Sequence, residues 1–340
     1  MSKVHSIALD IGSGYCKSIY LPESGDTSEM QRLVKSFKTA VGPSRNVTLQ
    51  PGVRPLVVEF EDKSFYVGNT AEVALSPDQR TNSLSPEWAY EDGYRALVYY
   101  IVAKALTSEG IEPSDTPIQV HLITGLPQAY YEVGAERLSN IYSNLHRFRH
   151  AGQTWVIDMV NVQVVPQAMG ALYSATETLL SDEEYSERVG VIDIGTFTSD
   201  FCLSEDVVYH AHESGGAPIG VSALVSSMRT VLERDLGFNY TDESIKKAFE
   251  RGTVLVRSAP HDIQKQLDEV ITQSGRQLVK ALPPSWDTNT MHLVLAGGGG
   301  ADHFFGKFFK KEYPHIKVIS HPENAIVLGY GIYGASAREA

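Results

Sequence analysis

The sequence predicts an α/β protein of two lobes built on the same plan. The stretch "IALDIGSGYCKS" around Asp10 is nearly repeated by "VIDIGTFTSD" at residues 191–200. In each half a strand, a glycine turn and a returning strand precede an alternation of strands and helices, which is typical of α/β folds. A chain of 340 residues is long for one compact core and fits two lobes.

The first half opens with a hairpin. Residues 4–10 form the pattern of a strand, "IGSG" that of a turn, and "YCKSIYL" that of the returning strand. Glycines between two strands indicate a hairpin, whereas the glycines of a dinucleotide-binding fold or a P-loop lead into a helix. A second hairpin, "PLVVEFEDKSFYVG", is expected inside a small inserted subdomain at about residues 30–80.

Helices and strands then alternate to the end of the first half. Apolar periodicity predicts helices at 86–110 and 128–144, separated by a buried strand at 118–127. "TWVIDMVNVQVVPQ" predicts one or two strands, and a helix begins just after Pro166 and Gln167. This order continues the α/β pattern.

The second half repeats the hairpin at 188–205 and adds a further strand, "VVYHAHESG". Next come helices that end at Gly237 and Gly252, the second of them capped by Thr241. The remaining pattern predicts an amphipathic helix at 260–282, a strand running into four glycines, a helix at 301–312, a strand at 316–320 and a last helix at 324–336.

Charge and cysteine usage exclude several classes. A formal net charge of -12 disfavours direct binding of nucleic acid. Cys16 and Cys202 are too few for a disulfide framework and lack zinc spacing, so both are expected to be buried structural thiols. No apolar signal core opens the chain and no run long enough to span a membrane occurs. We expect a cytoplasmic protein without membrane contact.

The two glycine turns suggest a clamp for a polyphosphate, because backbone N–H groups approach an anion closely where Cβ atoms are missing. Asp10 and Asp193 beside such a clamp would repel phosphate unless they held a hydrated Mg²⁺. Each aspartate alone also fits a simple turn cap, and the repetition in both halves favours the metal. The residues of this predicted clamp are Ser13, Gly14, Tyr15 and Lys17 in the first half, and Gly195 and Thr196 in the second.

Three further features are open to two interpretations. The glycine run from Gly297 could lie against a base or the α-phosphate, or be a plain strand–helix turn. Gln167, at a helix start, could orient a water or be an ordinary polar residue. Glu243 and Lys246 share a helix face at i, i+3 and could contact a ligand or simply face solvent.

In chain order, these segments resemble the nucleotide-binding motifs of the actin-like ATPase superfamily. "ALDIGSGYCKS" is similar to its phosphate-1 segment, "VVPQAMGAL" to connect-1, "VIDIGTFTSDF" to phosphate-2, "VLAGGGGADHF" to the adenosine segment and "ENAIVLGYGIYG" to connect-2. "VHLITGLPQAYY" and "GGAPIGVSALVSSM" further resemble the ParM/StbA plasmid-segregation group and its archaeal relatives.

The resemblance implies a duplicated actin-like, ribonuclease H-like fold with a nucleotide cleft between its lobes. Lobe I would span 1–165, lobe II 166–321, and residues 322–340 would form a helix that returns to lobe I. Catalysis would use Asp10, Gln167 and Asp193, with Mg²⁺ at the two aspartates. The nucleotide would contact Ser13, Gly14, Tyr15, Lys17, Gly195, Thr196, Glu243, Lys246, Gly297, Gly298 and Gly299.

One position departs from the resemblance. ParM proteins usually carry a glutamate where this chain has Gln167, and actin has a glutamine. A carboxylate could act as a base, whereas an amide can only orient water. The departure bears on the rate of hydrolysis and leaves nucleotide binding as expected.

The implied function is an Mg²⁺-dependent ATPase, with GTP as an alternative nucleotide, that forms a head-to-tail filament. It would move or position plasmid DNA through a DNA-binding adaptor protein. A non-polymerising small-molecule kinase or phosphatase of the same fold is the alternative, although the acceptor-site aspartate of such enzymes is not evident. A chaperone-type ATPase would need a peptide-binding domain after the last helix.

Overall fold

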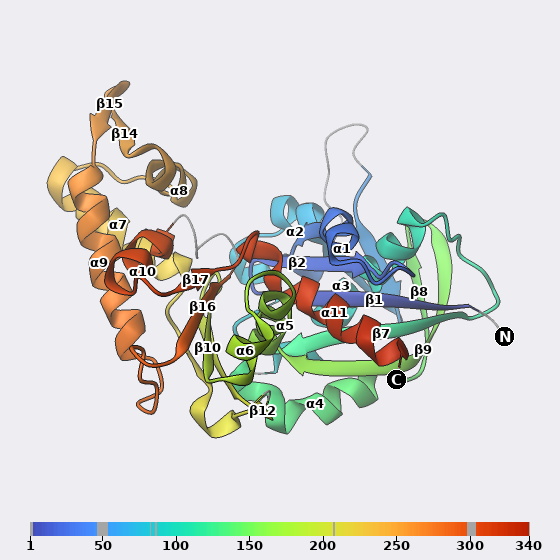
Figure 1. Ribbon diagram of the computed structural model, residues 1–340. Helices are drawn as coiled ribbons and strands as arrows, with labels where there is room; N and C mark the ends of the chain where they lie inside the picture. The colour runs from blue at the N-terminus through green and yellow to red at the C-terminus, as the bar shows by residue number, and fades with distance from the viewer. Residues whose placement is uncertain are drawn as a thin grey trace. The chain divides into compact units, whose positions relative to one another are not determined.

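The computed structural model describes residues 3–45, 54–81, 83–85, 87–206, 208–297 and 304–339 (Figure 1). The chain divides into two compact units. Unit 1 is Met1–Tyr173 together with Ile326–Ala340, and unit 2 is Ser174–Ala325. The last helix therefore belongs almost entirely to the unit that begins the chain. The division into lobe I, lobe II and a returning C-terminal helix, which was inferred from the sequence, stays a prediction.

Unit 1 is built on one mixed sheet with the strand order β3-β2-β1-β7-β9-β8-β5-β6-β4 in the described residues. β1, β7 and β9 are parallel, and β2 returns antiparallel to β1. The strands are β1 (Val4–Ile11), β2 (Tyr15–Tyr20), β3 (Lys35–Lys38), β4 (Val41–Pro43), β5 (Val57–Phe60), β6 (Lys63–Val67), β7 (Ile118–Leu126), β8 (Leu145–His150) and β9 (Gln153–Pro166).

Helices cover both faces of the central strands of unit 1. Leu122 of β7 packs into the core that α3 and α4 complete, while its neighbour Ile123 meets α11 on the other face. A Cβ atom at Gly334 of α11 would lie 2.9 Å from Ile123, so this glycine lets the helix approach the sheet. The helices are α1 (Thr27–Leu33), α2 (Gly68–Ala74), α3 (Asp92–Ser108), α4 (Gln128–Tyr142), α5 (Gln167–Thr178) and α11 (Ala325–Glu339), with 3₁₀ turns η1 (Pro77–Gln79) and η2 (Trp88–Tyr90).

Unit 2 has a smaller sheet of order β12-β11-β10-β16-β17, with β13 also paired to β11, and a separate β14–β15 hairpin. Its strands are β10 (Val189–Ile194), β11 (Ser199–Glu205), β12 (Val208–Tyr209), β13 (Gly215–Ala217), β14 (Thr253–Val256), β15 (Ala259–Asp262), β16 (His292–Ala296) and β17 (Lys317–Val318). The helices are α6 (Asp182–Ser186), α7 (Val221–Leu236), α8 (Asp242–Arg251), α9 (Gln264–Lys280) and α10 (Gly306–Glu312), with η3 (Ala211–Glu213) and η5 (Pro322–Asn324).

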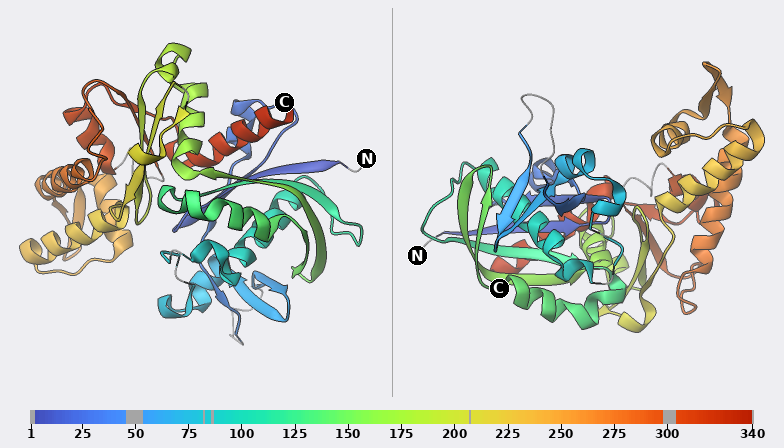
Figure 2. Two further views of the ribbon diagram at one scale, coloured as in Figure 1. Left: turned by 90° about the horizontal axis from the view of Figure 1, so that it is seen from below. Right: turned by 180° about the vertical axis from the view of Figure 1, so that it is seen from behind.

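Within unit 2, α7 and α9 pack side by side, and the β14–β15 hairpin lies beside α8 (Figure 2). Predicted helix ends are confirmed here. Gly237 and Gly252 adopt the left-handed conformation after α7 and α8, and the Thr241 hydroxyl caps α8 by accepting from Ser244 N at 3.3 Å. These boundaries depend on local backbone chemistry, which explains why the sequence reveals them.

The two sheets share a plan, which confirms the predicted duplicated α/β fold. In each, an antiparallel hairpin is extended on one side by two parallel strands: β2-β1-β7-β9 in unit 1 and β11-β10-β16-β17 in unit 2. Cys16 and Cys202 occupy equivalent second hairpin strands, and both are buried as expected. Burial raises the pKa of Cys16 to about 12, so this thiol is inert at neutral pH. Among the described residues, no helix combines the length and apolar character needed to cross a bilayer.

Two predicted elements were wrong. "VVYHAHESG" is not one strand, because β12 stops at Tyr209 and η3 follows. There the Ser214 hydroxyl accepts from Leu203 N at 3.0 Å and replaces a strand partner. The helix predicted from residue 260 begins only at Gln264, because the preceding residues form β15. Arg257 and Ser258 make the two-residue β14–β15 turn with positive φ (49° and 69°), without the glycine or asparagine that usually marks such a turn.

Candidate functional site

The hairpin of unit 1 has a tight turn that begins with Gly12. Gly12 N donates to Tyr15 O at 3.1 Å, and a Cβ atom on Gly12 would lie 2.9 Å from that oxygen. The turn is held from outside, since the Thr39 hydroxyl donates to Gly12 O at 2.6 Å and Thr39 N donates to Gly14 O at 3.3 Å. The Ser83 hydroxyl donates to Ser13 O at 3.3 Å. Thr39 and Ser83 therefore fix the main-chain carbonyl groups of this turn.

Tyr15, another residue of the predicted phosphate loop, lies at the surface with 46% of its area exposed. The ammonium group of Lys38 lies 4.5 Å above the centre of its ring. A cation over an aromatic face is attracted by the ring quadrupole. Lys38 thus brings a positive charge next to the loop, and sequence reasoning had not singled it out.

Asp10 is the buried acid of the unit 1 hairpin. In the β1–β2 register it lies opposite Lys17, whose Nζ is 3.5 Å from Asp10 Oδ2. Gln167, the first residue of α5 after the last residue of β9, donates from Nε2 to Asp10 Oδ1 at 3.3 Å. Burial raises the pKa of Asp10, while Lys17 and Gln167 partly oppose the rise. The structure thus brings together the three predicted residues Asp10, Lys17 and Gln167.

The hairpin of unit 2 has the same turn. Gly195 N donates to Thr198 O at 2.8 Å, and a Cβ atom on Gly195 would lie 3.0 Å from that oxygen. Here the first turn of α7 holds the loop: Val221 N donates to Gly195 O at 3.1 Å and Ser222 N to Thr196 O at 2.8 Å. Two N–H groups at the start of α7 find their partners in this way.

Asp193 is the buried acid of the second hairpin and pairs in register with Asp200 on β11. Asp200 is also buried, and Gly216 of β13 lies opposite it. Residues paired across an antiparallel ladder project from the same face of the sheet, so the two carboxylates share one face. Sequence reasoning missed Asp200. Its signal was the spacing, since Asp200 follows Asp193 by the same interval that separates Lys17 from Asp10.

The glycine run begins at the same sheet edge. Gly297 follows β16, whose last residue, Ala296, pairs with Asp193. The φ of Gly297 is 126°, and a Cβ atom at this position would lie 2.3 Å from Ile194 O, so only glycine fits. Gly298 and Gly299 lie outside the described residues. In unit 2, Gly297 therefore lies close to Asp193 and to the loop that begins at Gly195.

Glu243 and Lys246 lie on the exposed face of α8. Glu243 pairs with Lys247 at 3.3 Å, one turn along the helix, and Ile245 and Phe249 are buried on the opposite face. The helix is as amphipathic as expected. The role of Glu243 and Lys246 in nucleotide binding stays a prediction.

Two family models match the chain. The model of the actin-like proteins' N-terminal domain matches residues 8–170, and that of the archaeal actin homologue MreB-like C-terminal domain matches residues 191–310. The chain is an actin-like protein. The two matches include the glycine turn and the buried aspartate of each hairpin, so the resemblance drawn from the motifs is confirmed at the level of the superfamily. A search of the curated proteins found no significant match.

Solved structures of other actin-like proteins cover nearly all of this one. The archaeal actin homologue Ta0583 is 18% identical with a TM-score of 0.75, over 98% of this chain and 100% of its own. The 15-stranded ParM filament from Clostridium botulinum is 19% identical (TM-score 0.67; 99% and 100%). Bacillus thuringiensis ParM with ATP is 14% identical (TM-score 0.70; 99% and 100%). At these identities the likeness shows the fold of this actin-like protein.

Proposed function

We propose that this protein is a cytoplasmic, Mg²⁺-dependent ATPase that assembles head to tail into filaments when it binds nucleotide. The observation that carries the proposal is the same glycine hairpin in both units, each with a buried aspartate at the equivalent position. A Cβ atom would lie 2.9 Å from Tyr15 O at Gly12, 3.0 Å from Thr198 O at Gly195 and 2.3 Å from Ile194 O at Gly297, so each of these tight turns favours a residue without a side chain.

The residues of the hairpins fit magnesium and phosphate. Mg²⁺ takes carboxylate oxygens together with water and phosphate oxygens, and Asp10, Asp193 and Asp200 supply carboxylates. Lys17 supplies a point charge for phosphate, and the Ser13–Tyr15 and Gly195–Thr196 loops supply backbone N–H groups. When bound, Mg²⁺ would neutralise charge on the phosphates during phosphoryl transfer. Burial raises the pKa of Asp10 and so disfavours its ionised form. A cation bound beside Asp10 would oppose this effect and favour the carboxylate.

Gln167 is proposed to position the attacking water. Its amide nitrogen donates to Asp10, so the amide oxygen is the end that can accept a hydrogen bond from water. An amide does not take up the water proton at neutral pH. We therefore assign Gln167 an orienting role, which depends on Asp10 holding the amide in place.

The finer function draws on the relatives. Two of them are named as ParM structures, one as a 15-stranded filament and one with ATP, and Ta0583 is known in complex with ADP. We extend filament formation and ATP use, with GTP as a second candidate nucleotide, to this chain. A net charge of -12 suits an indirect link to DNA, so the proposed cargo is plasmid DNA bound through an adaptor protein.

Sedimentation tests the proposal. Purified protein with Mg²⁺ is centrifuged with ATP, ADP, a non-hydrolysable ATP analogue or GTP, and phosphate release is measured in parallel. We expect pelleted polymer with ATP and with the analogue, and loss of polymer as ATP is consumed. Nucleotide binding without sedimentable polymer under any of these conditions would overturn the filament and favour a small-molecule kinase or phosphatase of the same fold.

A further inference from the structure

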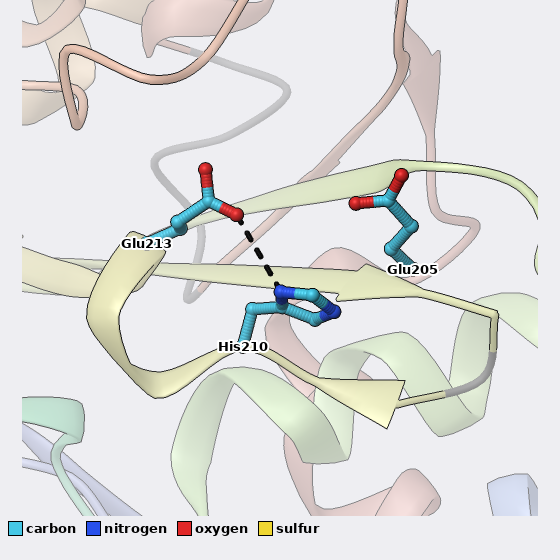
Figure 3. Close-up of side chains that lie close together, drawn as sticks. All are labelled: Glu205, His210 and Glu213. Atoms are coloured by element: carbon cyan, nitrogen blue, oxygen red, sulfur yellow. Dashed lines mark ion pairs between the residues drawn. The ribbon is translucent and has the colours of Figure 1, made fainter.

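A second cluster of ligand-type side chains lies in unit 2 and has no part in the proposed nucleotide chemistry. Glu205 ends β11, His210 follows β12 and Glu213 ends η3. One potential ligand atom from each residue lies within 4.8 Å of those of the other two. Figure 3 shows the imidazole beside both carboxylates.

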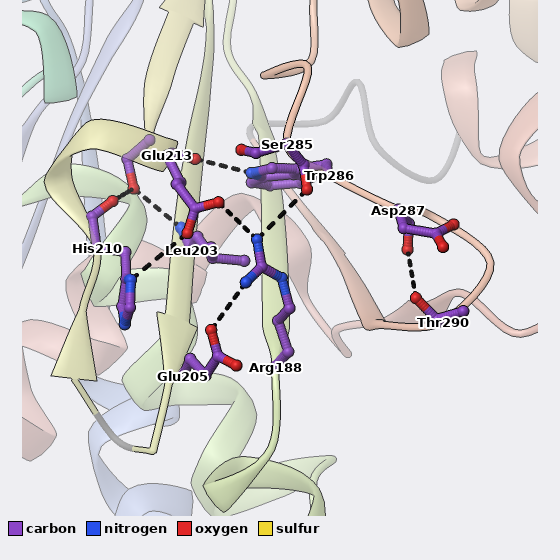
Figure 4. Close-up of polar contacts among 10 residues, drawn as sticks. Arg188, Leu203, Glu205, His210, Glu213, Ser285, Trp286, Asp287 and Thr290 are labelled. Atoms are coloured by element: carbon purple, nitrogen blue, oxygen red, sulfur yellow. Dashed lines mark hydrogen bonds and ion pairs between the residues drawn. The ribbon is translucent and has the colours of Figure 1, made fainter.

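The main chain beneath this cluster is firmly held. His210 N donates to Leu203 O at 2.9 Å, and the Ser214 hydroxyl donates to His210 O at 2.8 Å while it accepts from Leu203 N. Glu213 O accepts from the indole N–H of Trp286 at 2.7 Å (Figure 4). Because these bonds fix the backbone at His210 and Glu213, their side chains start from defined positions.

Arg188 orients the two carboxylates. Its guanidinium donates to Glu205 Oε2 at 2.8 Å and to Glu213 Oε1 at 2.7 Å (Figure 4). The other oxygen of Glu213, Oε2, faces His210 Nδ1 at 3.5 Å. Side chains that hold metal-binding carboxylates in this way are common outer partners of metal sites. The cluster of two carboxylates and one guanidinium carries a net charge of -1, which favours a further cation.

The separation between His210 and Glu213 fits a bound metal better than a hydrogen bond. At 3.5 Å, Nδ1 and Oε2 are farther apart than in most hydrogen bonds, which lie at about 2.7–3.2 Å. Two ligands at about 2.0–2.1 Å from a tetrahedral ion are about 3.3–3.4 Å apart. A metal ion could therefore enter between these two atoms with little movement of either side chain.

We propose that Glu205, His210 and Glu213 bind one late first-row transition-metal ion, Zn²⁺ or Co²⁺, with Arg188 as the outer partner of both carboxylates. An imidazole with two carboxylates suits such ions, whereas Mg²⁺ and Ca²⁺ prefer oxygen ligands alone. The three side chains are 40%, 36% and 25% exposed, so water can reach the ion and complete its coordination. This site is separate in chemistry from the proposed magnesium site, because it includes a nitrogen ligand.

Cobalt titration tests the proposal. Full-length protein is freed of metal with chelator, kept without nucleotide at pH 7.5, and titrated with Co²⁺ while visible absorption is recorded. We expect one equivalent to produce a band that Zn²⁺ removes, and at least tenfold weaker Co²⁺ binding in His210→Ala. Any Co²⁺ held by Asp10 or Asp193 would have oxygen ligands only and would not respond to that change.

His292→Ala is the matched control. His292 also lies in unit 2, is 32% exposed and contacts two carboxylates, Glu184 at 3.8 Å and Glu187 at 2.7 Å. We expect this variant to bind Co²⁺ as the wild type does. Glu205→Gln provides a second test if His210→Ala melts at a lower temperature, and it should also bind at least tenfold more weakly. The proposal is overturned if the wild type gives no band, if both histidine variants change binding equally, or if Glu205→Gln binds normally.

Discussion

The hairpins of the two units place opposite charges at one equivalent position. Asp10 lies across from Lys17, whereas Asp193 lies across from Asp200. The backbones match: Ile11 pairs with Cys16 and Ile194 with Ser199, so both connections have four residues, and both start with a glycine bonded to the fourth residue. One backbone design thus supports two electrostatic arrangements.

The different residues opposite Asp10 and Asp193 suggest that the two hairpins interact with different parts of a ligand. In unit 1 the acid already has an ammonium group 3.5 Å away and an amide donor from Gln167. In unit 2 two buried carboxylates share one face, and like charges directly opposite in a ladder repel. We therefore expect the unit 2 hairpin to depend more strongly on a metal cation and the unit 1 hairpin on phosphate.

The largest predicted effect comes from removing the acid of unit 2. Asp193→Ala should slow phosphate release by roughly 100-fold or more, the scale seen when one group that stabilises developing charge is removed. Filaments formed with ATP should then persist, because their nucleotide is not consumed. Phosphate release and sedimentation are measured together, with Asp268→Ala on the exposed face of α9 as a surface control. Wild-type turnover in Asp193→Ala would place the chemistry elsewhere.

The next effect concerns the amide that touches the acid of unit 1. Gln167→Ala removes the donor to Asp10 and the proposed water-orienting oxygen. We expect about tenfold slower hydrolysis because the water is less well oriented, while the affinity for ATP stays within about twofold. Single-turnover hydrolysis and fluorescent-nucleotide binding separate the two quantities. A variant that hydrolyses ATP normally would remove Gln167 from the site.

Replacing the residue opposite each aspartate by a neutral one tests the charge difference directly. Asp200→Asn should raise the Mg²⁺ concentration for half-maximal hydrolysis about tenfold, because one of two neighbouring carboxylates loses its charge. Lys17→Met should instead weaken nucleotide binding and leave the Mg²⁺ requirement nearly unchanged, because its ammonium is proposed to contact phosphate. Magnesium titrations at saturating and limiting ATP distinguish these results. Equal effects of both variants on both quantities would contradict the comparison.

The glycines test the part that the hairpins share. Gly12→Ala and Gly195→Ala place a Cβ atom 2.9 Å and 3.0 Å from a carbonyl oxygen. Each should lower the free energy of unfolding by about 1–3 kcal/mol, as overpacking typically does. Urea denaturation of the two variants provides the measurement, with Gly152→Ala, where no atom lies within 4 Å but φ is 80°, as a reference for strain alone. A large cost at one glycine and none at the other would show that the turns differ.

Much of the fold was predictable because its signals are local. The hairpins combine alternating apolar residues with a glycine turn, and α7 and α8 end at left-handed glycines. The β14–β15 hairpin was missed because Arg257 and Ser258 take positive φ without a turn residue. β8 was missed although His146, Phe148 and His150 alternate with exposed arginines, a pattern that only becomes clear beside its partner β9.

The candidate site was predictable where its residues lie within a motif. Asp10, Lys17 and Gln167 were named from sequence, and the structure brings them into contact. Asp200 was not, because its spacing from Asp193, equal to that of Lys17 from Asp10, gains meaning only when the ladder pairing is known. The cluster around Arg188 depends on contacts from this residue, just before β10, to Glu205 of β11 and Glu213 of η3, and no spacing along the chain reveals them. Residues that become neighbours only through pairing of strands in the sheet could therefore not be predicted from the sequence.

The smallest predicted effect is a pH dependence that comes from two buried histidines of unit 1. His146 and His150 are buried in β8, and burial lowers the pKa of both. His146 bonds with Tyr99 Oη at 2.8 Å and with Tyr142 O at 2.9 Å, which suits the neutral ring. A lowered folded-state pKa means that the unfolded chain takes up protons first. The contribution of these two histidines to the free energy of unfolding is therefore fully present above pH about 6.5, and it decreases as the pH falls below that value.

Urea denaturation at pH 7.5 and pH 5.5 measures this dependence. The wild type should lose unfolding free energy on acidification, and His146→Asn combined with His150→Asn should lose less, because two groups that protonate on unfolding are gone. If the double variant were as acid-sensitive as the wild type, titration of other groups would dominate, and the assignment of the pH dependence to His146 and His150 would fail.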